Sequence, residues 1–405
     1  MNRANGKIFK AIIVGGGASG LLTAIELSNK FGGQNVLLVE KLDRVGKKLL
    51  STGNGQCNLT NKNCAISRFH GELPLFSESI LNRFGYKSVC EYFENLGLLL
   101  TEENGKVYPL SRQASSVVDA LRFKLLSLNT NVITGAKVDC ATKKGDLFTA
   151  CLSNGECYLA QNLIISVGGK AQKHLGTDGG SYSLLEDFGH ELTKLYPSIV
   201  QLKCEPSKIK GLKGLKQKAL VKTTSNGNSV EFSGDILFTD FGVSGNSVFS
   251  ISSYIKGGDG EVVVDFCPDL SFEELKNSII KKQNNCSYLT GENLMLGVMN
   301  SKIACAVLRN SGFNLNSKIS SFNAGDVASA LKNYKIRTLG TLGFDYAQVT
   351  KGGITTKDFS NETLESKLVK NLYATGEVLD VDGDCGGFNL TWAFSSAFAV
   401  SEAIN

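Results

Sequence analysis

The chain has 405 residues, of which 42% are hydrophobic and 20% charged, so it is long enough for two or three structural units with sizeable cores. Its formal net charge is +5, but it has no long Lys/Arg run and no basic run interleaved with aromatic residues. This pattern argues against nucleic acid as a partner. No stretch approaches the roughly 18 apolar residues of a membrane span, so we expect a cytoplasmic protein without membrane association.

The cysteines and histidines limit the kinds of site that we expect. Eleven cysteines are scattered without a CxxC pair, and this odd number without a secretory context predicts free thiols in a reducing compartment. The three histidines, His70, His174 and His190, lie far apart in the chain, so we expect no metal site. We interpret Cys57 and Cys385 as small buried hydrophobic residues rather than redox groups.

The first forty residues have the pattern of a dinucleotide-binding βαβ unit. The β-branched run 9–14 predicts a buried parallel strand, and Gly-x-Gly-x-x-Gly at 15–20 opens a segment with helical spacing. A second strand at 36–39 ends at Glu40, which would accept hydrogen bonds from an adenosine ribose. The alternative is a glycine-rich turn in another kind of α/β protein.

Each glycine of this pattern has a separate predicted role. Gly15 permits a tight turn, and Gly17 lets backbone N–H groups approach a pyrophosphate at the helix N-terminus. Gly20 allows close packing of the helix on the strand. Ala18 and Ser19, between these glycines, complete the predicted cofactor-binding turn.

A long polar segment follows Glu40 and includes Lys41. From Lys48 to Asn61 it reads KLLSTGNGQCNLTN, which is too polar to form a core and suits a ligand larger than NAD. The predicted ligand contacts in it are Thr52, Gly53, Asn54, Cys57 and Asn58. Lys47 and Lys48 would add positive charge near a diphosphate, or else form a solvated basic turn.

Two further strand ends are followed by glycines. A short antiparallel meander in 131–160 is predicted to return to a parallel strand at 163–167, which leads into the cofactor-binding candidates Ser166, Val167, Gly168 and Gly169. The backbone at 137–138 (Lys137, Val138) would flank the adenine, or else belong to an ordinary surface strand.

Near the C-terminus, a strand at 372–377 precedes an Asp/Gly loop at 380–387 and an apolar helix at 389–403. The helix N-terminus suits a pyrophosphate or the electron-rich edge of a reduced flavin. The predicted contacts are Gly376, Glu377, Asp380, Gly387, Phe388, Asn389 and Leu390. Carboxylates in this region would bind ribityl hydroxyls or cap the helix rather than act as acids and bases.

These segments together resemble a known family. The arrangement GGGASG…VEKLDRVGKKLLSTGNGQCNLTN and the C-terminal LYATGEVLDVDGDCGGFNLTWAFSSAFAVSEAI are similar to bacterial NAD(P)/FAD-dependent oxidoreductases of the BaiN-like and aminoacetone oxidase-like kind. The resemblance covers nearly the whole chain and implies that the polar loop contacts a flavin. It implies noncovalently bound FAD, with NAD(P)H as a possible transient electron donor because no second Rossmann fingerprint is present.

The expected fold class is α/β, with a Rossmann-type FAD-binding domain formed by residues 1–193 and 346–405. A β-rich substrate domain is inserted at 194–268, and a helical attachment with a return strand follows at 269–345. Within the attachment, Ser271 and Glu274 form a predicted capping box at a helix start.

The preferred function is hydride transfer between flavin and a small organic substrate. The resemblance implies reduction of an activated C=C bond, bile-acid-like, steroid-like or another enone. An aminoacetone-type amine oxidase that uses oxygen is the alternative within enzymes, and a flavin-containing RNA- or protein-binding module is the alternative outside them. The sequence indicates neither a catalytic residue nor the oligomeric state.

A loop at 239–246 is predicted to face the flavin, because a Gly- and Ser-containing turn between strands and helices suits a substrate site. The substrate-site candidates are Thr239, Asp240, Ser244, Gly352 and Gly353. Asp240 replaces a His that is common in relatives, and Gln56 replaces their usual Arg. These exchanges predict a less positive site with a weaker preference for anionic substrates.

Overall fold

The computed structural model describes residues 4–225 and 227–405. The chain divides into two compact units: the sheet unit, which ends at Tyr196 and resumes at Val349, and the barrel unit, from Pro197 to Gln348. Both divisions lie three residues beyond those expected for an FAD-binding domain with an insertion. Among the described residues, no helix is both long and apolar enough to cross a membrane.

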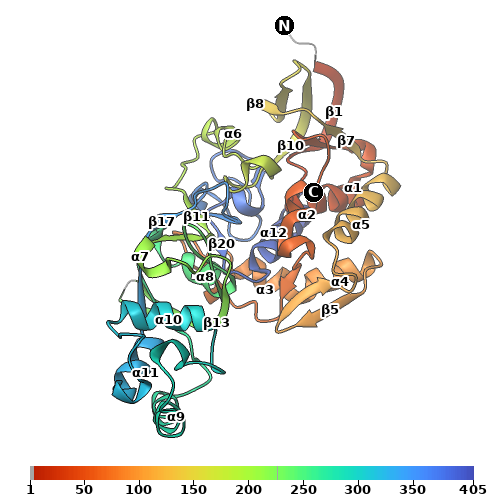
Figure 1. Ribbon diagram of the computed structural model, residues 1–405. Coiled ribbons are helices and arrows are strands. Elements are labelled where there is room, and N and C mark those ends of the chain that lie inside the picture. Colours follow the sequence, from red (N-terminus) through yellow and green to blue (C-terminus); the bar gives the residue numbers. More distant parts are fainter. Residues whose placement is uncertain (1–3, 226) are drawn as a thin grey trace. The chain divides into compact units, whose positions relative to one another are not determined.

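The sheet unit contains the predicted βαβ pattern. Its strands are β1 (Ala4–Val14), β2 (Val36–Glu40), β3 (Thr60–Asn61), β4 (Phe69–His70), β5 (Leu100–Glu103), β6 (Lys106–Pro109), β7 (Asn131–Thr134), β8 (Val138–Lys144), β9 (Leu147–Leu152), β10 (Cys157–Ile165), β18 (Val349–Lys351), β19 (Leu372–Ala374) and β20 (Asp382–Gly383), and β11 (Tyr196–Ser198) lies across the division. Its helices are α1 (Ala18–Phe31), α2 (Lys47–Ser51), α3 (Glu78–Phe84), α4 (Tyr86–Asn95), α5 (Ala114–Ser127), α6 (Ser183–Glu186) and α12 (Phe388–Ala403) (Figure 1).

The main sheet has the order β7-β2-β1-β10-β9-β8, and β19 also pairs with β10. The strands β7, β2, β1, β10 and β19 run parallel, whereas β8 and β9 are antiparallel to their neighbours. The predicted meander is therefore present, and one continuous strand, β10, takes part in both patterns. It pairs with β9 near its start and with β19 near its end.

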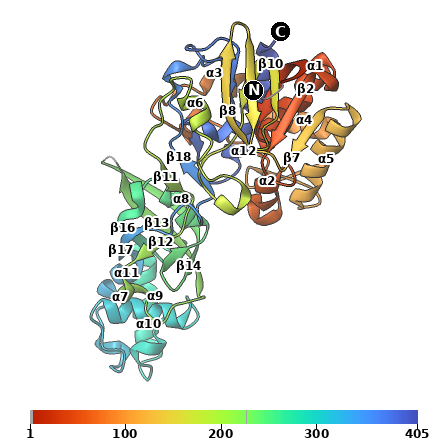
Figure 2. The same cartoon turned by 90° about the horizontal axis from the view of Figure 1, so that it is seen from above.

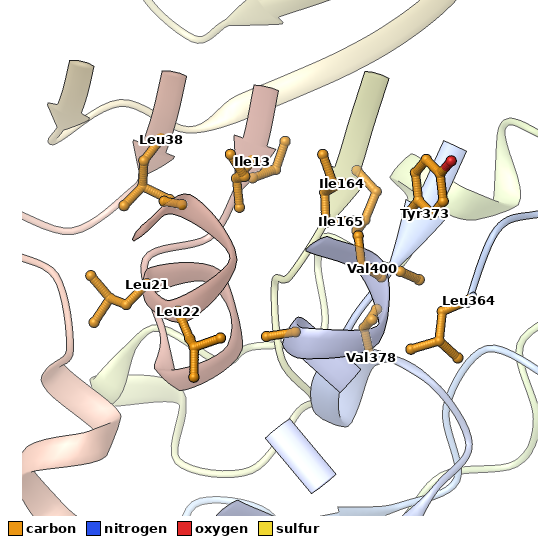
Figure 3. Close-up of a cluster of buried hydrophobic side chains, with 14 of the residues drawn as sticks. Ile13, Leu21, Leu22, Leu38, Ile164, Ile165, Leu364, Tyr373, Val378 and Val400 are labelled. Atoms are coloured by element: carbon orange, nitrogen blue, oxygen red, sulfur yellow. The ribbon is translucent and has the colours of Figure 1, made fainter. Parts of the chain in front are cut away.

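The core explains why the first segment forms a central strand. Residues 11–14 are all buried, as expected for a parallel strand that is covered on both faces. Figure 3 shows side chains from β1, β2 and β10 meeting helices α1 and α12, with Leu21, Leu22 and Val400 contributed by the helices. The hydrophobic run thus accounts for the burial of β1 on both faces of the sheet.

One expectation about the cysteines is wrong. Cys151 and Cys157 form a disulfide between β9 and β10, where they are directly paired in the antiparallel ladder. The other nine cysteines, all within the described residues, form no disulfide. Chain spacing alone did not reveal the pair, because it depends on the register of the β9–β10 hairpin.

The barrel unit is a closed barrel of strand order β12-β15-β14-β13-β16-β17. These strands are β12 (Leu202–Cys204), β13 (Lys216–Ser225), β14 (Asn228–Phe238), β15 (Gly242–Ser244), β16 (Asp259–Asp265) and β17 (Tyr334–Thr341) (Figure 2). The helices are α7 (Pro206–Ile209), α8 (Asn246–Ser252), α9 (Phe272–Asn285), α10 (Ser301–Asn310) and α11 (Ala324–Lys332).

The inserted strands and helices share one core rather than forming separate parts. Val221 and Val264 of the barrel belong to the same buried cluster as Leu331 of α11. The predicted capping box is confirmed, since Glu274 N–H donates to Ser271 Oγ and Ser271 N–H donates to the Glu274 carboxylate. The division expected between residues 268 and 269 therefore has no counterpart in the packing.

Candidate cofactor site

The turn between β1 and α1 contains glycines with different constraints. Gly15 has a φ of +106°, and a Cβ there would lie 2.4 Å from the Ser166 carbonyl oxygen. A Cβ on Gly20 would lie 1.9 Å from the Gly15 carbonyl oxygen. A Cβ on Gly17, in contrast, would meet nothing within 4 Å. Packing thus requires Gly15 and Gly20, whereas the space beside Gly17 is open to a ligand.

The N-terminus of α1 is suited to an anion. No side chain caps this 14-residue helix, and its first turn contains no acidic residue. The amide N–H groups of a first helical turn lack partners within the helix, and the helix dipole adds positive potential there. The open space beside Gly17 therefore has the chemistry of a phosphate-binding site.

Glu40 organises the loop at the end of β2. Its carboxylate accepts a hydrogen bond from Gly16 N–H at 2.7 Å and another from Leu42 N–H at 2.8 Å. Each carboxylate oxygen has a further lone pair for a ligand hydroxyl. The sequence predicted only a ribose contact, so the bond to the glycine turn is an additional role.

A hollow of about 340 Å³, partly open to solvent, lies beside this carboxylate. It is lined by Val14, Gly15, Val39, Glu40, Lys41, Ala136, Lys137, Val138, Val167, Gly176 and Ser181. A second hollow, too narrow to hold a water molecule, is lined by Lys41, Val167, Gly168, Gly169, Asp178, Gly179, Ser181 and Tyr182. The structure thus brings together predicted residues from four separate segments at the carboxyl ends of parallel strands, where ligands of α/β sheets bind.

The polar loop begins with a short helix, α2, which its polar composition did not predict. After it, Gly53, Asn54 and Cys57 have positive φ values of 56°, 55° and 57°, so the chain turns sharply. Burial raises the pKa of the Cys57 thiol to about 12, which makes this cysteine a poor nucleophile at neutral pH. The loop therefore presents backbone and amide groups rather than a reactive thiol.

The C-terminal helix meets the polar loop although more than 300 residues separate them. Thr60 and Thr391 share a hydrogen bond of 2.8 Å between their hydroxyls, and a Cβ on Gly387 would lie 2.7 Å from the Thr60 carbonyl oxygen. The side chain of Asn389 bonds both the N–H and the C=O of Gly383. Close backbone packing thus holds the helix N-terminus against the loop.

Lys48 and Glu377 form an ion pair of 2.7 Å. The other oxygen of Glu377 accepts a hydrogen bond from Thr350 N–H, also at 2.7 Å. Lys47 instead pairs with Asp43 at the surface. The two lysines therefore differ, and Lys48 reaches the predicted site with its charge already opposed by a carboxylate.

The C-terminal loop has an aspartate at every second position, namely Asp380, Asp382 and Asp384. Asp380 accepts a hydrogen bond from Glu72 N–H, and Asp384 accepts bonds from Arg68 and His70. None of them caps α12, whose N-cap residue is Gly387 with no side-chain hydrogen bond. Helix capping, one of the two roles considered for these carboxylates, is thus excluded.

Asp382, the middle acid, is buried, and neither of its oxygens has a hydrogen-bond partner among the described residues. Burial raises the pKa of Asp382, opposed by the charges of Lys351 and His70. Burial also raises the pKa of Asp380, to about 6. This loop consequently holds carboxyl groups that are costly to ionise.

Other buried polar atoms near the predicted ligand also lack partners in the described structure. They are Asn58 Oδ1 in the polar loop and the hydroxyl of Tyr182 beside the second hollow. Buried polar groups without partners are uncommon in folded proteins. These atoms and the open space beside Gly17 fit a polar dinucleotide such as FAD.

The sequence interpretation missed Arg112, which lies in the loop before α5. It has a φ of +53°, and its guanidinium lies over the Tyr108 ring and donates to the Gln56 amide oxygen at 3.4 Å. It also pairs with Glu103. A guanidinium therefore lies beside Gln56, but its charge is already opposed by Glu103, and the less positive site expected from the exchange at position 56 stays a prediction.

The predicted substrate-site residues fall into both units. In the sheet unit, Gly352 and Gly353 are buried, and Gly353 N–H donates to Thr193 Oγ1. In the barrel unit, Ser244 is buried on β15, and Asp240 pairs with Lys213 at the surface. Thr239 closes the turn by bonding the Gly242 carbonyl. Their role in substrate binding stays a prediction.

Comparison with known proteins gives a family match. The model of the family described as "HI0933-like protein Rossmann domain" matches residues 9–403. The match spans both units and nearly the whole chain.

Two characterised relatives cover almost the full length. The chain is 35% identical over 402 residues to the 3-dehydro-bile acid delta(4,6)-reductase of Clostridium scindens, covering 96% of this chain and 98% of the relative. It is 29% identical over 398 residues to the ribosomal RNA dihydrouridine synthase of Escherichia coli, covering 97% of each chain.

Among solved structures, the 3-ketosteroid delta1-dehydrogenase of Sterolibacterium denitrificans superposes with a TM-score of 0.51. The comparison covers 98% of this chain and 99% of that chain at 12% sequence identity. At this identity the likeness shows a shared fold.

Proposed function

The chain belongs to the HI0933-like Rossmann-domain family and is an FAD-dependent oxidoreductase, and we propose that it reduces a C=C bond conjugated to a carbonyl group. The observation that carries the proposal is the full-length similarity to a delta(4,6)-reductase of a 3-dehydro-bile acid. Dihydrouridine synthesis, the activity of the second relative, likewise saturates a C=C bond conjugated to a carbonyl. Bound FAD would supply a hydride for this chemistry.

Residues of the sheet unit would hold the cofactor. In this proposal the α1 N-terminus at Gly17 binds the pyrophosphate, Glu40 the ribose, and the backbone at 137–138 the adenine. The polar loop at 52–58 and the N-terminus of α12 surround the flavin. Because Cys57 is buried with a raised pKa, a covalent thioether there is disfavoured, and we propose noncovalent FAD.

The substrate is proposed to be a steroid-like or other small enone, with NAD(P)H as electron donor. The sequence contains one strand–Gly-x-Gly-x-x-Gly–helix fingerprint, which FAD occupies in this proposal. A nicotinamide would therefore bind transiently rather than in a domain of its own.

RNA uridine is the second candidate substrate. The observation in its favour is the charge of the barrel unit, which has 17 Lys and Arg residues against 13 Asp and Glu, a net +4 of the chain's +5. Seven of these lysines lie between 203 and 222, but four of them, Lys213, Lys216, Lys218 and Lys222, form ion pairs with acids. This pairing weakens the electrostatic case, so the small enone stays the first candidate.

An anaerobic stopped-flow experiment tests the proposal. The FAD-loaded protein is mixed with NADH, NADPH and aminoacetone separately, and bleaching of the flavin absorbance is followed. The reduced protein is then mixed with a 3-oxo-Δ4,6-steroid or with ribosomal RNA that lacks dihydrouridine. Products are identified by mass spectrometry.

We expect bleaching by a nicotinamide and reoxidation coupled to saturation of the steroid. Bleaching by aminoacetone but not by nicotinamides would instead support the amine oxidase alternative. Dihydrouridine formation without steroid turnover, together with RNA binding that weakens as salt rises, would support the second candidate. Failure of both acceptors under these conditions would contradict C=C reduction.

A further inference from the structure

Three cysteines lie in one row across adjacent strands of the sheet unit. Cys140 of β8 is directly paired with Cys151 of β9, and Cys151 is directly paired with Cys157 of β10. Residues directly opposite each other in antiparallel strands project from the same face of the sheet. The three sulfur-bearing side chains therefore lie on one face, in a line that crosses the strands.

The outer members of the row differ in bonding and exposure. Cys151 is bonded to Cys157, which is buried, whereas Cys140 is an exposed free thiol on the edge strand. Ala141 and Ala150, the next pair in the ladder, are buried on the opposite face. The accessible thiol of Cys140 thus lies beside Cys151, whose disulfide partner Cys157 is buried.

Thiol–disulfide exchange requires a thiolate to approach a sulfur of the disulfide through a mixed disulfide intermediate, with the bond to the leaving sulfur opposite the attack. Strand pairing places Cys140 on the side of Cys151 that lies away from Cys157, which is the side from which such an attack would come. We propose that these residues form a thiol–disulfide exchange site that accepts small thiols and disulfides through Cys140.

The exchange balances without an external oxidant. The Cys140 thiolate attacks Cys151 Sγ, so the Cys140–Cys151 bond forms as the Cys151–Cys157 bond breaks. Cys157 leaves as a thiolate and takes up the proton that Cys140 released. Forming the first disulfide from two thiols removes two electrons and two protons, which a small-molecule disulfide such as oxidised glutathione accepts.

The exchange moves the covalent link toward the larger hollow. The Cys151–Cys157 bond joins β9 to β10, whereas a Cys140–Cys151 bond joins β8 to β9. Lys137 and Val138, at the start of β8, line the hollow, and Ser153 N–H after β9 donates to the Lys137 carbonyl at 2.8 Å. The row therefore lies next to a wall of the candidate cofactor site.

Two variants of the full-length protein test whether disulfide formation depends on direct pairing of the cysteines. Cys157→Ser leaves Cys140 and Cys151 directly paired, so oxidised glutathione should convert them into a disulfide. Cys151→Ser leaves Cys140 and Cys157 two strand spacings apart, about 9.6 Å, beyond the roughly 7 Å that a disulfide spans. We expect the Cys151→Ser variant to form at least about tenfold less internal disulfide than Cys157→Ser, because its two remaining cysteines of the row are too far apart to bond.

Peptide mapping can resolve every pairing. After acid quenching and blocking with N-ethylmaleimide, trypsin cuts after Lys143 and Lys144, between Cys140 and Cys151. A glutamate-specific protease cuts after Glu156, between Cys151 and Cys157. Each cysteine then lies on its own peptide, and Cys286→Ser serves as a control that should keep the wild-type pattern.

In the wild-type protein at pH 8 we expect two disulfide isomers. One has the Cys151–Cys157 bond, and the other has the Cys140–Cys151 bond with N-ethylmaleimide on Cys157. Cys140→Ser should retain only the Cys151–Cys157 bond. The exchange is overturned if wild-type protein never yields the Cys140–Cys151 isomer, or if Cys151→Ser crosslinks as fully as Cys157→Ser. A wild-type protein whose Cys151 and Cys157 stay fully labelled after oxidised glutathione would overturn the site itself.

Discussion

The sheet unit and the barrel unit treat their polar groups differently. In the sheet unit, space lies open beside a glycine of the predicted cofactor site and some buried polar atoms lack hydrogen-bond partners, whereas in the barrel unit many charged side chains form ion pairs. Gly17 faces open space, and Asn58 and Asp382 have buried oxygens without hydrogen bonds among the described residues. In the barrel unit, Lys332 bonds Asp265 at 2.8 Å and donates to two backbone carbonyls. The difference indicates that polar groups of the sheet unit are available to a ligand, whereas the buried charges of the barrel unit are met within that unit; the Thr338 hydroxyl is the buried side-chain atom of the barrel that lacks a partner among the described residues.

The strongest test of this comparison is Gly17→Val. A valine side chain would fill the open space beside the α1 N-terminus, and several charge-assisted hydrogen bonds of about 1.5–3 kcal/mol each would be lost. We expect FAD affinity to fall by at least about three orders of magnitude, measured by flavin fluorescence quenching on titration of FAD-free protein.

The FAD-free Gly17→Val protein should unfold at nearly the wild-type temperature, since a Cβ there meets nothing within 4 Å. Gly20→Ala is the matched contrast, because its Cβ would overlap the Gly15 carbonyl oxygen and destabilise the fold itself. FAD-replete Gly17→Val protein would contradict the cofactor assignment.

Lys332→Met tests the barrel unit. It leaves the buried Asp265 carboxylate without its cation, so we expect a loss of about 3–5 kcal/mol in the free energy of unfolding of this unit. The only tryptophan, Trp392, lies on α12 of the sheet unit, so its fluorescence reports that unit while circular dichroism reports both.

The circular dichroism transition should therefore move to lower denaturant, with FAD content unchanged. Asp269→Asn, at an exposed ion pair with Lys218, is the control and should change little. Wild-type stability of Lys332→Met would show that the buried pair is not required.

Asp380→Asn tests the buried acids of the sheet unit. The pKa of Asp380 is raised by burial, and then by the Asp382 and Glu72 carboxylates, from 3.8 to about 6. The folded state therefore binds more protons than the unfolded state between these values, and this group's contribution to stability is lost as pH rises toward 6. Asparagine cannot ionise and can still accept the bond from Glu72 N–H.

The stability of Asp380→Asn relative to wild type should thus rise by up to about 3 kcal/mol between pH 4 and pH 7.5. Denaturant unfolding of FAD-free protein, followed by Trp392 fluorescence, measures this change. A difference between the two proteins that does not vary with pH would mean that Asp380 titrates normally in the folded state.

Glu40→Ala has the smallest expected effect of these changes. Loss of a carboxylate that accepts hydroxyl hydrogen bonds should weaken FAD binding by about one to two orders of magnitude. Part of the loss reflects the freed Gly16 and Leu42 amides. Titration of FAD into FAD-free protein measures it, with Asp119→Ala, an exposed acid on α5, as control. An unchanged affinity would place the ribose acceptor elsewhere.

Much of the sheet unit could be predicted because its signals are local. The run before Gly15 predicted a buried strand, and β1 is buried there. The glycine spacing predicted the turn, and the steric contacts of Gly15 and Gly20 explain it. In the barrel unit, the Ser271 capping box was equally visible, because all its partners lie within one helical turn.

The unpredicted features depend on strand register and long-range packing. Arg112 reaches Gln56 from a loop 56 residues away, and Lys48 meets Glu377 across 329 residues of sequence. The cysteine row arises only once the β8–β9–β10 register is set. No spacing in the chain encodes that alignment.

The sequence by itself determined where the backbone must turn tightly and which strands are buried, because steric limits and hydrophobic periodicity act over a few residues. The tertiary structure alone decided which polar groups find partners. Hydrogen bonds and ion pairs require atoms to meet within a few ångströms, and here the meeting atoms, such as those of Thr60 and Thr391, come from opposite ends of the chain.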